Sequence, residues 1–191
     1  MSEQIHVAVL MGGDSSERDV SLQSGKAVAE GLQRAGHEVL ALDIPSVAAV
    51  LTMPELKNVD LVFPALHGGQ GEDGHLQAVL DVLKIPYALS GARASAIAMD
   101  KGATKRIMRS AGIPTPDWLQ VTWNRKAAKP GSLTTRGGTE RDNGGLTVER
   151  VFARASQEIG FPLVIKLNGA GSSVGVEIVE RPDQFEAAVA R

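Results

Sequence analysis

The feature that most constrains the fold is an alternation of short apolar runs with segments of helical periodicity. Residues 5–10 form an apolar run bounded by Gly12 and Gly13, which is typical of a buried parallel strand. The periodicity then predicts a helix, two strands and a helix at residues 18–35, 39–42, 61–64 and 73–83. This alternation predicts a doubly wound α/β domain built on a parallel sheet.

The second half of the chain is organised differently. Helices are predicted at 94–99, 104–111 and 148–159, and strands at 118–121 and on both sides of a Gly/Ser-rich turn in FPLVIKLNGAGSSVGVEIV. Residues 124–145 carry five glycines and five Lys/Arg without periodicity. We expect a mobile loop or a disordered insertion there, with solvated charges.

Composition excludes several classes of partner. The formal net charge is −2 and only 4% of the residues are aromatic, which argues against a nucleic-acid-binding surface. The absence of cysteine excludes thiolate zinc and a cysteine nucleophile. The first residues lack the basic region of a signal peptide, and no segment approaches the roughly 18 apolar residues that span a bilayer. We therefore expect a soluble, cytoplasmic protein with no membrane partner.

The loop after the first predicted strand is the first candidate site. Ligands of open α/β sheets bind beyond the carboxyl ends of the strands, and here that edge carries Gly12, Gly13 and Glu17. A carboxylate at this position suits an ammonium group rather than a phosphate. Alternatively, Ser15 or Ser16 caps the helix and Glu17 only complements the helix dipole.

The loop after the third predicted strand is the second candidate. His67 follows that strand in a segment rich in glycine, where the backbone can approach a ligand closely. Histidine can donate a hydrogen bond or a positive charge to a carboxylate. Glu72 and Asp73 have a simpler explanation, since acidic residues favour the start of the next helix.

Two lysines complete the set of candidates. Lys101 lies between two predicted helices, where a solvated surface lysine is the usual interpretation. Lys166 ends an apolar strand, and five of the seven residues from 169 to 175 are glycine or serine. A lysine beside such a loop can hold phosphates, although an ordinary hairpin loop is the alternative.

In this order and spacing, the four segments resemble the D-alanine–D-alanine ligase family. The matching stretches are VAVLMGGDSSERDVSLQSG, ALHGGQGEDGHLQAVLDVLKIPY, SGARASAIAMDK and FPLVIKLNGAGSSVGV. The resemblance implies a Rossmann-like pre-ATP-grasp domain at 1–100 and an incomplete α+β ATP-grasp subdomain at 101–191. It also implies ATP-dependent joining of two D-alanines through an acyl phosphate, for peptidoglycan precursors.

The resemblance assigns the amino-acid side of the site to three residues. Glu17 would hold the ammonium of the first D-alanine and share a catalytic hydrogen-bonded network with Ser172. His67 would lie near the carboxylate of that substrate and the acyl phosphate. A homodimer formed through the N-terminal domain is also implied.

The resemblance assigns the ATP side to Lys101 and Lys166, which would contact phosphates, and to Gly171, Ser172 and Ser173, which would form the phosphate-side loop. No metal ligand is assigned, because the residues that bind Mg²⁺ are expected beyond Arg191. We therefore expect the chain alone to be inactive.

The family pattern is not kept everywhere. Leu167, Gly169 and Ala170 replace the usual proline, bulky residue and acidic residue. Two alternatives therefore stay open: a catalytically inactive ligand-binding remnant of the fold, and another ATP-grasp ligase joining a different carboxylate and amine. A D-alanine–D-lactate ligase is a close variant that these residues do not distinguish.

Overall fold

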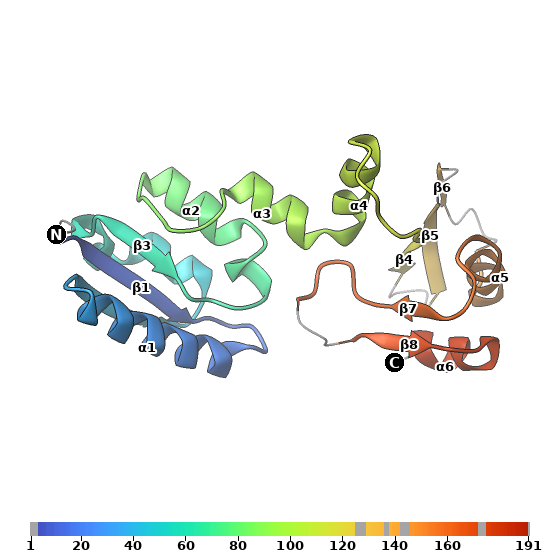
Figure 1. Ribbon diagram of the computed structural model, residues 1–191, viewed down its shortest axis with the longest axis horizontal. Helices are drawn as coiled ribbons and strands as arrows, with labels where there is room; N and C mark the ends of the chain where they lie inside the picture. The colour runs from blue at the N-terminus through green and yellow to red at the C-terminus, as the bar shows by residue number, and fades with distance from the viewer. Residues whose placement is uncertain (1–3, 125–128, 136–137, 142–145, 172–174, 191) are drawn as a thin grey trace. The chain divides into compact units, whose positions relative to one another are not determined.

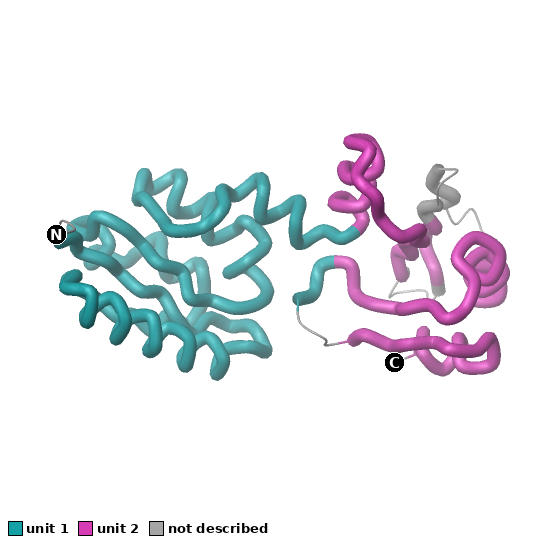
Figure 2. Tube along the Cα trace, viewed as in Figure 1, with its two compact units in different colours: residues 1–101, 169–172 teal, residues 102–168, 173–191 magenta. Residues whose placement is uncertain are grey.

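The computed structural model describes residues 4–124, 129–135, 138–141, 146–171 and 175–190. These residues form two compact units, which Figure 2 shows in different colours. Unit 1 comprises residues 1–101 and 169–172, and unit 2 comprises 102–168 and 173–191.

Unit 1 is built on a parallel sheet of three strands. β1 (His6–Gly12) lies in the middle, with β2 (Glu38–Ile44) on one side and β3 (Leu61–Pro64) on the other. Val7 pairs with Val39 of β2 and Leu61 of β3, and both ladders are parallel. The prediction of a parallel sheet with strands near these positions is confirmed.

Alternate residues of β1 enter two different cores, as the period of two in a strand requires. Ala8 and Leu10 belong to a cluster that includes residues of α2 (His75–Leu83). Val7, Val9 and Met11 belong to a second cluster that includes Ala29 of α1 (Arg18–Arg34). The two helices accordingly cover opposite faces of the sheet (Figure 1).

Short helical segments connect these elements. Three 3-10 turns occur at Val47–Thr52, Pro54–Asn58 and Gly69–Gly71. Unit 1 continues with α3 (Ala92–Met99), and α4 (Lys101–Ser110) leads into unit 2. Both helices occur close to their predicted positions.

Unit 2 contains two small antiparallel sheets. One has the order β4 (Gln120–Asn124), β5 (Lys129–Thr135) and β6 (Gly138–Arg141), and the other pairs β7 (Leu163–Ile165) with β8 (Glu177–Val179). The helices of this unit are α5 (Val148–Glu158) and α6 (Phe185–Ala190). Its core includes Leu133, Val151, Val179 and Phe185.

The prediction of a mobile or disordered insertion at 124–145 is wrong for the part of this segment that the structure describes. β5 pairs with β4 from Gln120 to Asn124 and with β6 from Gly138 to Arg141. Leu133 of β5 is fully buried in the core of unit 2. Burial of this one large apolar side chain in a three-stranded sheet outweighs the polar composition of the segment.

A helix must be both long and apolar to cross a bilayer. Within the described residues, no helix combines the length and the apolar character that a membrane crossing needs.

Candidate active site

The candidate site of unit 1 lies where the strand order reverses. The chain leaves β1 through α1 on one face of the sheet, whereas it leaves β3 through α2 on the other face. β1 and β3 are neighbours, so the loops after them diverge at the carboxyl edge of the sheet. Ligands of open α/β sheets bind in the crevice that such a reversal creates.

Two serines tie these neighbouring loops together. Ser21 is fully buried, and its hydroxyl accepts from the Gly12 amide at 2.8 Å and donates to the Ala65 carbonyl at 2.7 Å. The Ser15 hydroxyl donates to the His67 carbonyl at 2.5 Å and accepts from the Glu17 amide at 3.1 Å. The loops after β1 and β3 are therefore joined by hydrogen bonds of two side chains, Ser21 and Ser15.

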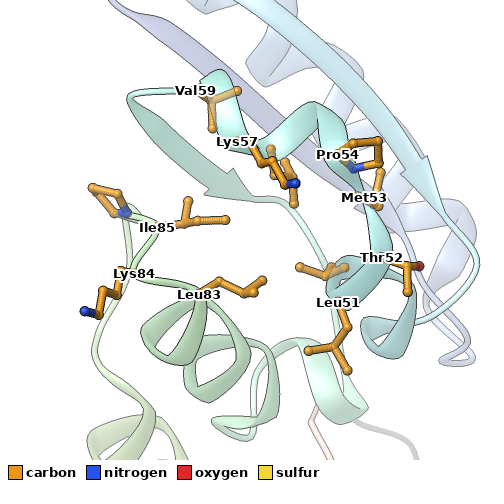
Figure 3. A pocket seen from close by; sticks show the side chains of 12 residues that line it. Leu51, Thr52, Met53, Pro54, Lys57, Val59, Leu83, Lys84 and Ile85 are labelled. Carbon is orange, nitrogen blue, oxygen red and sulfur yellow. The ribbon is translucent and has the colours of Figure 1, made fainter.

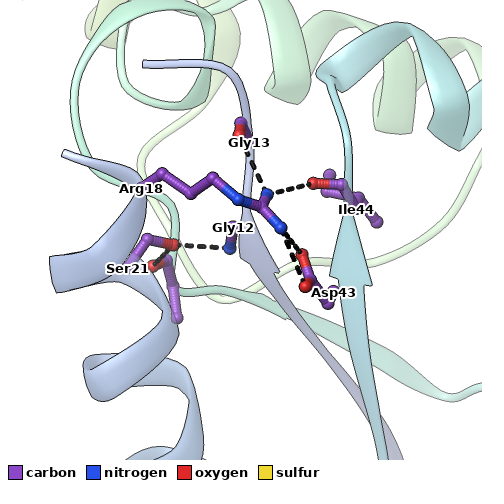
Figure 4. Close-up of polar contacts among 7 residues, drawn as sticks. Gly12, Gly13, Arg18, Ser21, Asp43 and Ile44 are labelled. Carbon is purple, nitrogen blue, oxygen red and sulfur yellow. Dashed lines mark hydrogen bonds and ion pairs between the residues drawn. The ribbon is translucent and has the colours of Figure 1, made fainter. Parts of the chain in front are cut away.

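Arg18 fixes the end of β1 against the end of β2. One nitrogen of its guanidinium, Nη2, donates to both carboxylate oxygens of Asp43, each at 2.8 Å. Another of its nitrogens donates to the carbonyls of Gly13 at 3.0 Å and Ile44 at 3.2 Å (Figure 4). This clamp holds the start of α1, and hence Glu17 before it, at the edge of the sheet.

Glu17 occupies the N-cap position of α1, and its carboxylate approaches the loop after β3. Gly68 has φ +70°, and a Cβ atom placed there would lie only 2.6 Å from Glu17 Oε2. A Cβ atom on Gly171, which belongs to the second segment of unit 1, would lie 3.4 Å from Glu72 Oε2 and 3.9 Å from Glu17 Oε2. Glycine at both positions lets two carboxylates lie close to the backbone.

His67 lies in the same region, held by partners from the chain. Its Nε2 atom is 2.9 Å from the Ser24 hydroxyl of α1, and its Nδ1 atom is 3.7 Å from Glu72 Oε1. The predicted residues Glu17 and His67 are thus brought together, with Glu72 beside them. Two carboxylates and an imidazole suit a ligand that carries an amino group and an acidic group.

Lys101 also contacts the second segment of unit 1. Its ammonium donates to the Ala170 carbonyl at 2.5 Å. The contact places Lys101 next to the Gly/Ser-rich segment that contains Gly171. Ser172 and Ser173 lie outside the described residues.

Lys166 follows β7 in unit 2, where a second lysine lies near it. Burial lowers the pKa of Lys105 below its ordinary value, and the positive charge of Lys166 lowers it further. The Lys105 ammonium donates to Thr115 Oγ1 at 3.1 Å and to the Pro116 carbonyl at 2.9 Å. Lys105 was not predicted, although its position one helical turn after Lys101 in α4 was a signal that could have drawn attention to it.

A cavity of about 450 Å³ occurs elsewhere in unit 1 (Figure 3). Apolar side chains such as Leu51, Met53 and Ile85 line it, together with Lys57 and Lys84. It includes Val59, which precedes β3, whereas His67 follows that strand. The cavity therefore does not coincide with the candidate site.

Fold and site geometry together define the class: a doubly wound α/β unit whose candidate ligand site lies at the switch point between β1 and β3. The family profile described as "D-ala D-ala ligase N-terminus" matches residues 47–90. Along nearly its whole length, the chain is similar to D-alanine–D-alanine ligases.

Relatives and solved structures agree with this assignment. A D-alanine–D-alanine ligase of Moorella thermoacetica is 42% identical over 186 residues, which cover 96% of this chain and 53% of the relative. One of Gluconobacter oxydans is 41% identical, with 97% and 52% covered. The crystal structure of the ligase from Bacillus anthracis matches with a TM-score of 0.74 and 32% identity, covering 97% of this chain and 53% of that chain. The chain thus spans about half the length of the curated relatives it matches.

Proposed function

We propose that the protein to which this chain belongs joins two D-alanine molecules at the expense of ATP. The supporting observation is the approach of the Glu17 carboxylate to Gly68, the residue after His67, and to Gly171 within unit 1. A structure of the Bacillus anthracis ligase in complex with ATP matches this chain with a TM-score of 0.72 and 30% identity, which supports ATP as the second reactant.

The reaction balances as two transfers. A carboxylate oxygen of the first D-alanine attacks the γ-phosphorus of ATP, which gives an acyl phosphate and ADP. The amine of the second D-alanine then attacks the acyl carbon and loses a proton, and phosphate leaves. Anions must approach each other in both steps, so the site has to supply compensating positive charge.

The residues of this chain divide between the two reactants. On the amino-acid side, Glu17 pairs with the ammonium of the first D-alanine and His67 faces its carboxylate, with Ser172 in the network around Glu17. On the ATP side, phosphates are contacted by the two lysines and the Gly/Ser segment: Lys101, Lys166, Gly171, Ser172 and Ser173. The Lys101–Ala170 contact supports the placement of an ammonium at the start of that segment.

Mg²⁺, when bound, would supply positive charge that offsets the negative charge of the phosphates. Among the described residues, no three acidic or histidine side chains gather in a way that could hold a metal ion. We assign no metal ligand in this chain. We further propose a cytoplasmic location and a homodimer, both supported only by the family resemblance.

Steady-state kinetics of the full-length ligase test this assignment. Glu17→Gln should raise the KM for D-alanine by about 10- to 100-fold, since a hydrogen bond to a charged group contributes about 1.5–3 kcal/mol, and should leave the KM for ATP within about twofold. Glu30→Gln is the matched control, because Glu30 is an exposed acidic residue of the same helix.

Two results would contradict the proposal. Equal losses for D-alanine and ATP would remove Glu17 from the substrate site. Phosphate release that does not depend on D-alanine would refute the ligase assignment, and preferential use of D-lactate as the second substrate would indicate the ester-forming variant.

A further inference from the structure

The imidazole of His67 lies between two side chains of unit 1 that have different hydrogen-bonding capacities. Ser24 Oγ is 2.9 Å from Nε2, and Glu72 Oε1 is 3.7 Å from Nδ1. The side chains of His67 and Glu72 are only 35% and 37% exposed. Each ring nitrogen therefore has its own partner within the chain.

These partners distinguish the two neutral forms of the ring. The Glu72 carboxylate lies 3.7 Å from Nδ1, beyond hydrogen-bonding distance, and acts there through its negative charge. That charge favours a hydrogen on Nδ1 and disfavours a lone pair there. A serine hydroxyl can either donate or accept. With the hydrogen on Nδ1, Nε2 carries the lone pair and Ser24 donates to it.

We propose that Glu72 selects the Nδ1–H tautomer of His67 and that Ser24 fixes the ring, so that Nε2 is the nitrogen that takes up a proton. Both are positioning residues, since they act through His67. When Nε2 takes a proton from solvent, the Ser24 hydroxyl rotates and accepts from the new N–H. The ring can then change charge without moving and without losing either partner.

The consequence for catalysis rests on the proposed function. A carboxylate substrate and an acyl phosphate both bring negative charge to His67. An imidazole that becomes charged in a fixed orientation, with Glu72 already beside Nδ1, can meet that charge without a rearrangement. Ser24 lies one turn after Ser21 on the face of α1 that meets the strand ends, which explains how a helix residue reaches this loop.

Nitrogen NMR of the imidazole rings in the ¹⁵N-labelled chain tests the proposal directly. The chain has four histidines, and His67→Asn assigns the ring of interest by the loss of its signals. In spectra recorded at about pH 8.5, the shifts of the two ring nitrogens report which of them carries the hydrogen. We expect the hydrogen on Nδ1.

Two variants separate the two roles. Glu72→Gln should shift the ratio of tautomers by about fivefold towards Nε2–H, equivalent to about 1 kcal/mol, because an uncharged amide no longer favours a hydrogen on Nδ1. Asp19→Asn, which removes an exposed charge from the first turn of α1, is the control and should leave the ratio unchanged. Ser24→Ala should move the Nε2 resonance towards that of a ring nitrogen without a hydrogen bond, and Ser24→Thr should restore it.

A dominant Nε2–H form of His67 in the native chain would overturn the proposal, whether or not any variant folds. A ratio that changes less than twofold in Glu72→Gln, with the other three histidine rings unchanged, would also overturn it. An unchanged Nε2 resonance in Ser24→Ala would remove Ser24 from the assignment. These spectra need no substrate, so a failure of the ligase proposal leaves their interpretation intact.

Discussion

Ser21→Ala should lower the free energy of unfolding of unit 1 much more than the removal of a hydroxyl group from an exposed serine would. Ser21 is fully buried, and its hydroxyl is bonded to the Gly12 amide and the Ala65 carbonyl. Alanine leaves a donor at the end of β1 and an acceptor after β3 without this partner. An unsatisfied buried polar group costs about 1–3 kcal/mol, so we expect a loss of about 2–4 kcal/mol.

That loss is a large fraction of the roughly 5–15 kcal/mol by which a typical domain is stable. Urea denaturation followed by circular dichroism measures it, and hydrogen exchange of the Gly12 amide locates it. Ser95→Ala is the matched control, because Ser95 is not buried and its hydroxyl donates to the Ser90 carbonyl at 3.2 Å. A loss below about 0.5 kcal/mol, as expected for an ordinary surface substitution, together with unchanged protection of the Gly12 amide, would refute the reasoning.

Three further predictions concern other parts of unit 1. Arg18→Lys should lower the free energy of unfolding, measured by urea denaturation, by about 1–2 kcal/mol, because an ammonium cannot contact Asp43 and two carbonyls as the guanidinium does. The effect stays modest because the ion pair is partly exposed. An equal loss in Lys26→Arg, at an exposed site, would contradict this prediction. Gly68→Ala should be more destabilising than Gly36→Ala, although both glycines have positive φ. Gly68 has φ 70° and ψ 168°, a region that essentially only glycine adopts, and its Cβ would also meet the Glu17 carboxylate, whereas nothing lies within 4 Å of a Cβ at Gly36; equal losses would contradict this prediction. Tyr87, the single tyrosine, should titrate above 10.0, because burial raises its pKa first and the hydrogen bond to Asp81 adds to the rise. The fold favours the neutral phenol, so the stabilisation is present below pH 10.0 and is lost as the pH rises through the folded-state pKa. Tyrosinate absorbance measures the titration midpoint, and Asp81→Asn should lower that midpoint. A midpoint at or below 10.0 in the folded chain would contradict the prediction.

Periodicity was sufficient for the parallel sheet but not for the small sheet of unit 2. β1 has five consecutive buried residues from Val7 to Met11, which no exposed element would carry. β5 has a single large apolar residue, Leu133, among small polar neighbours, and its pairing with β4 and β6 comes from tertiary context. Short strands of this kind leave little signal in a sequence.

The candidate site was predictable to the level of loops and no further. Parallel strands place their carboxyl ends at one edge, which was enough to expect Glu17 and His67 near each other. The contact between Ser24 and His67 could not be read directly, because it depends on which face of α1 meets that edge. A signal did exist: Ser21, Ser24 and Gly25 are small or polar residues at core spacing in an amphipathic helix. The division of the chain near residue 100 and the roles of the site residues stay predictions.

The central position of β1 has a consequence for how the chain is made. β1 precedes both of its partners, and at about 5–20 residues per second a ribosome needs on the order of 3–10 s to extend the chain from the end of β1 to the end of β3. During that time, β1, which is buried on both faces in the folded unit, has only part of its sheet available for pairing. Such a segment is prone to pair with other chains, so early association with a chaperone should improve the yield of folded nascent protein.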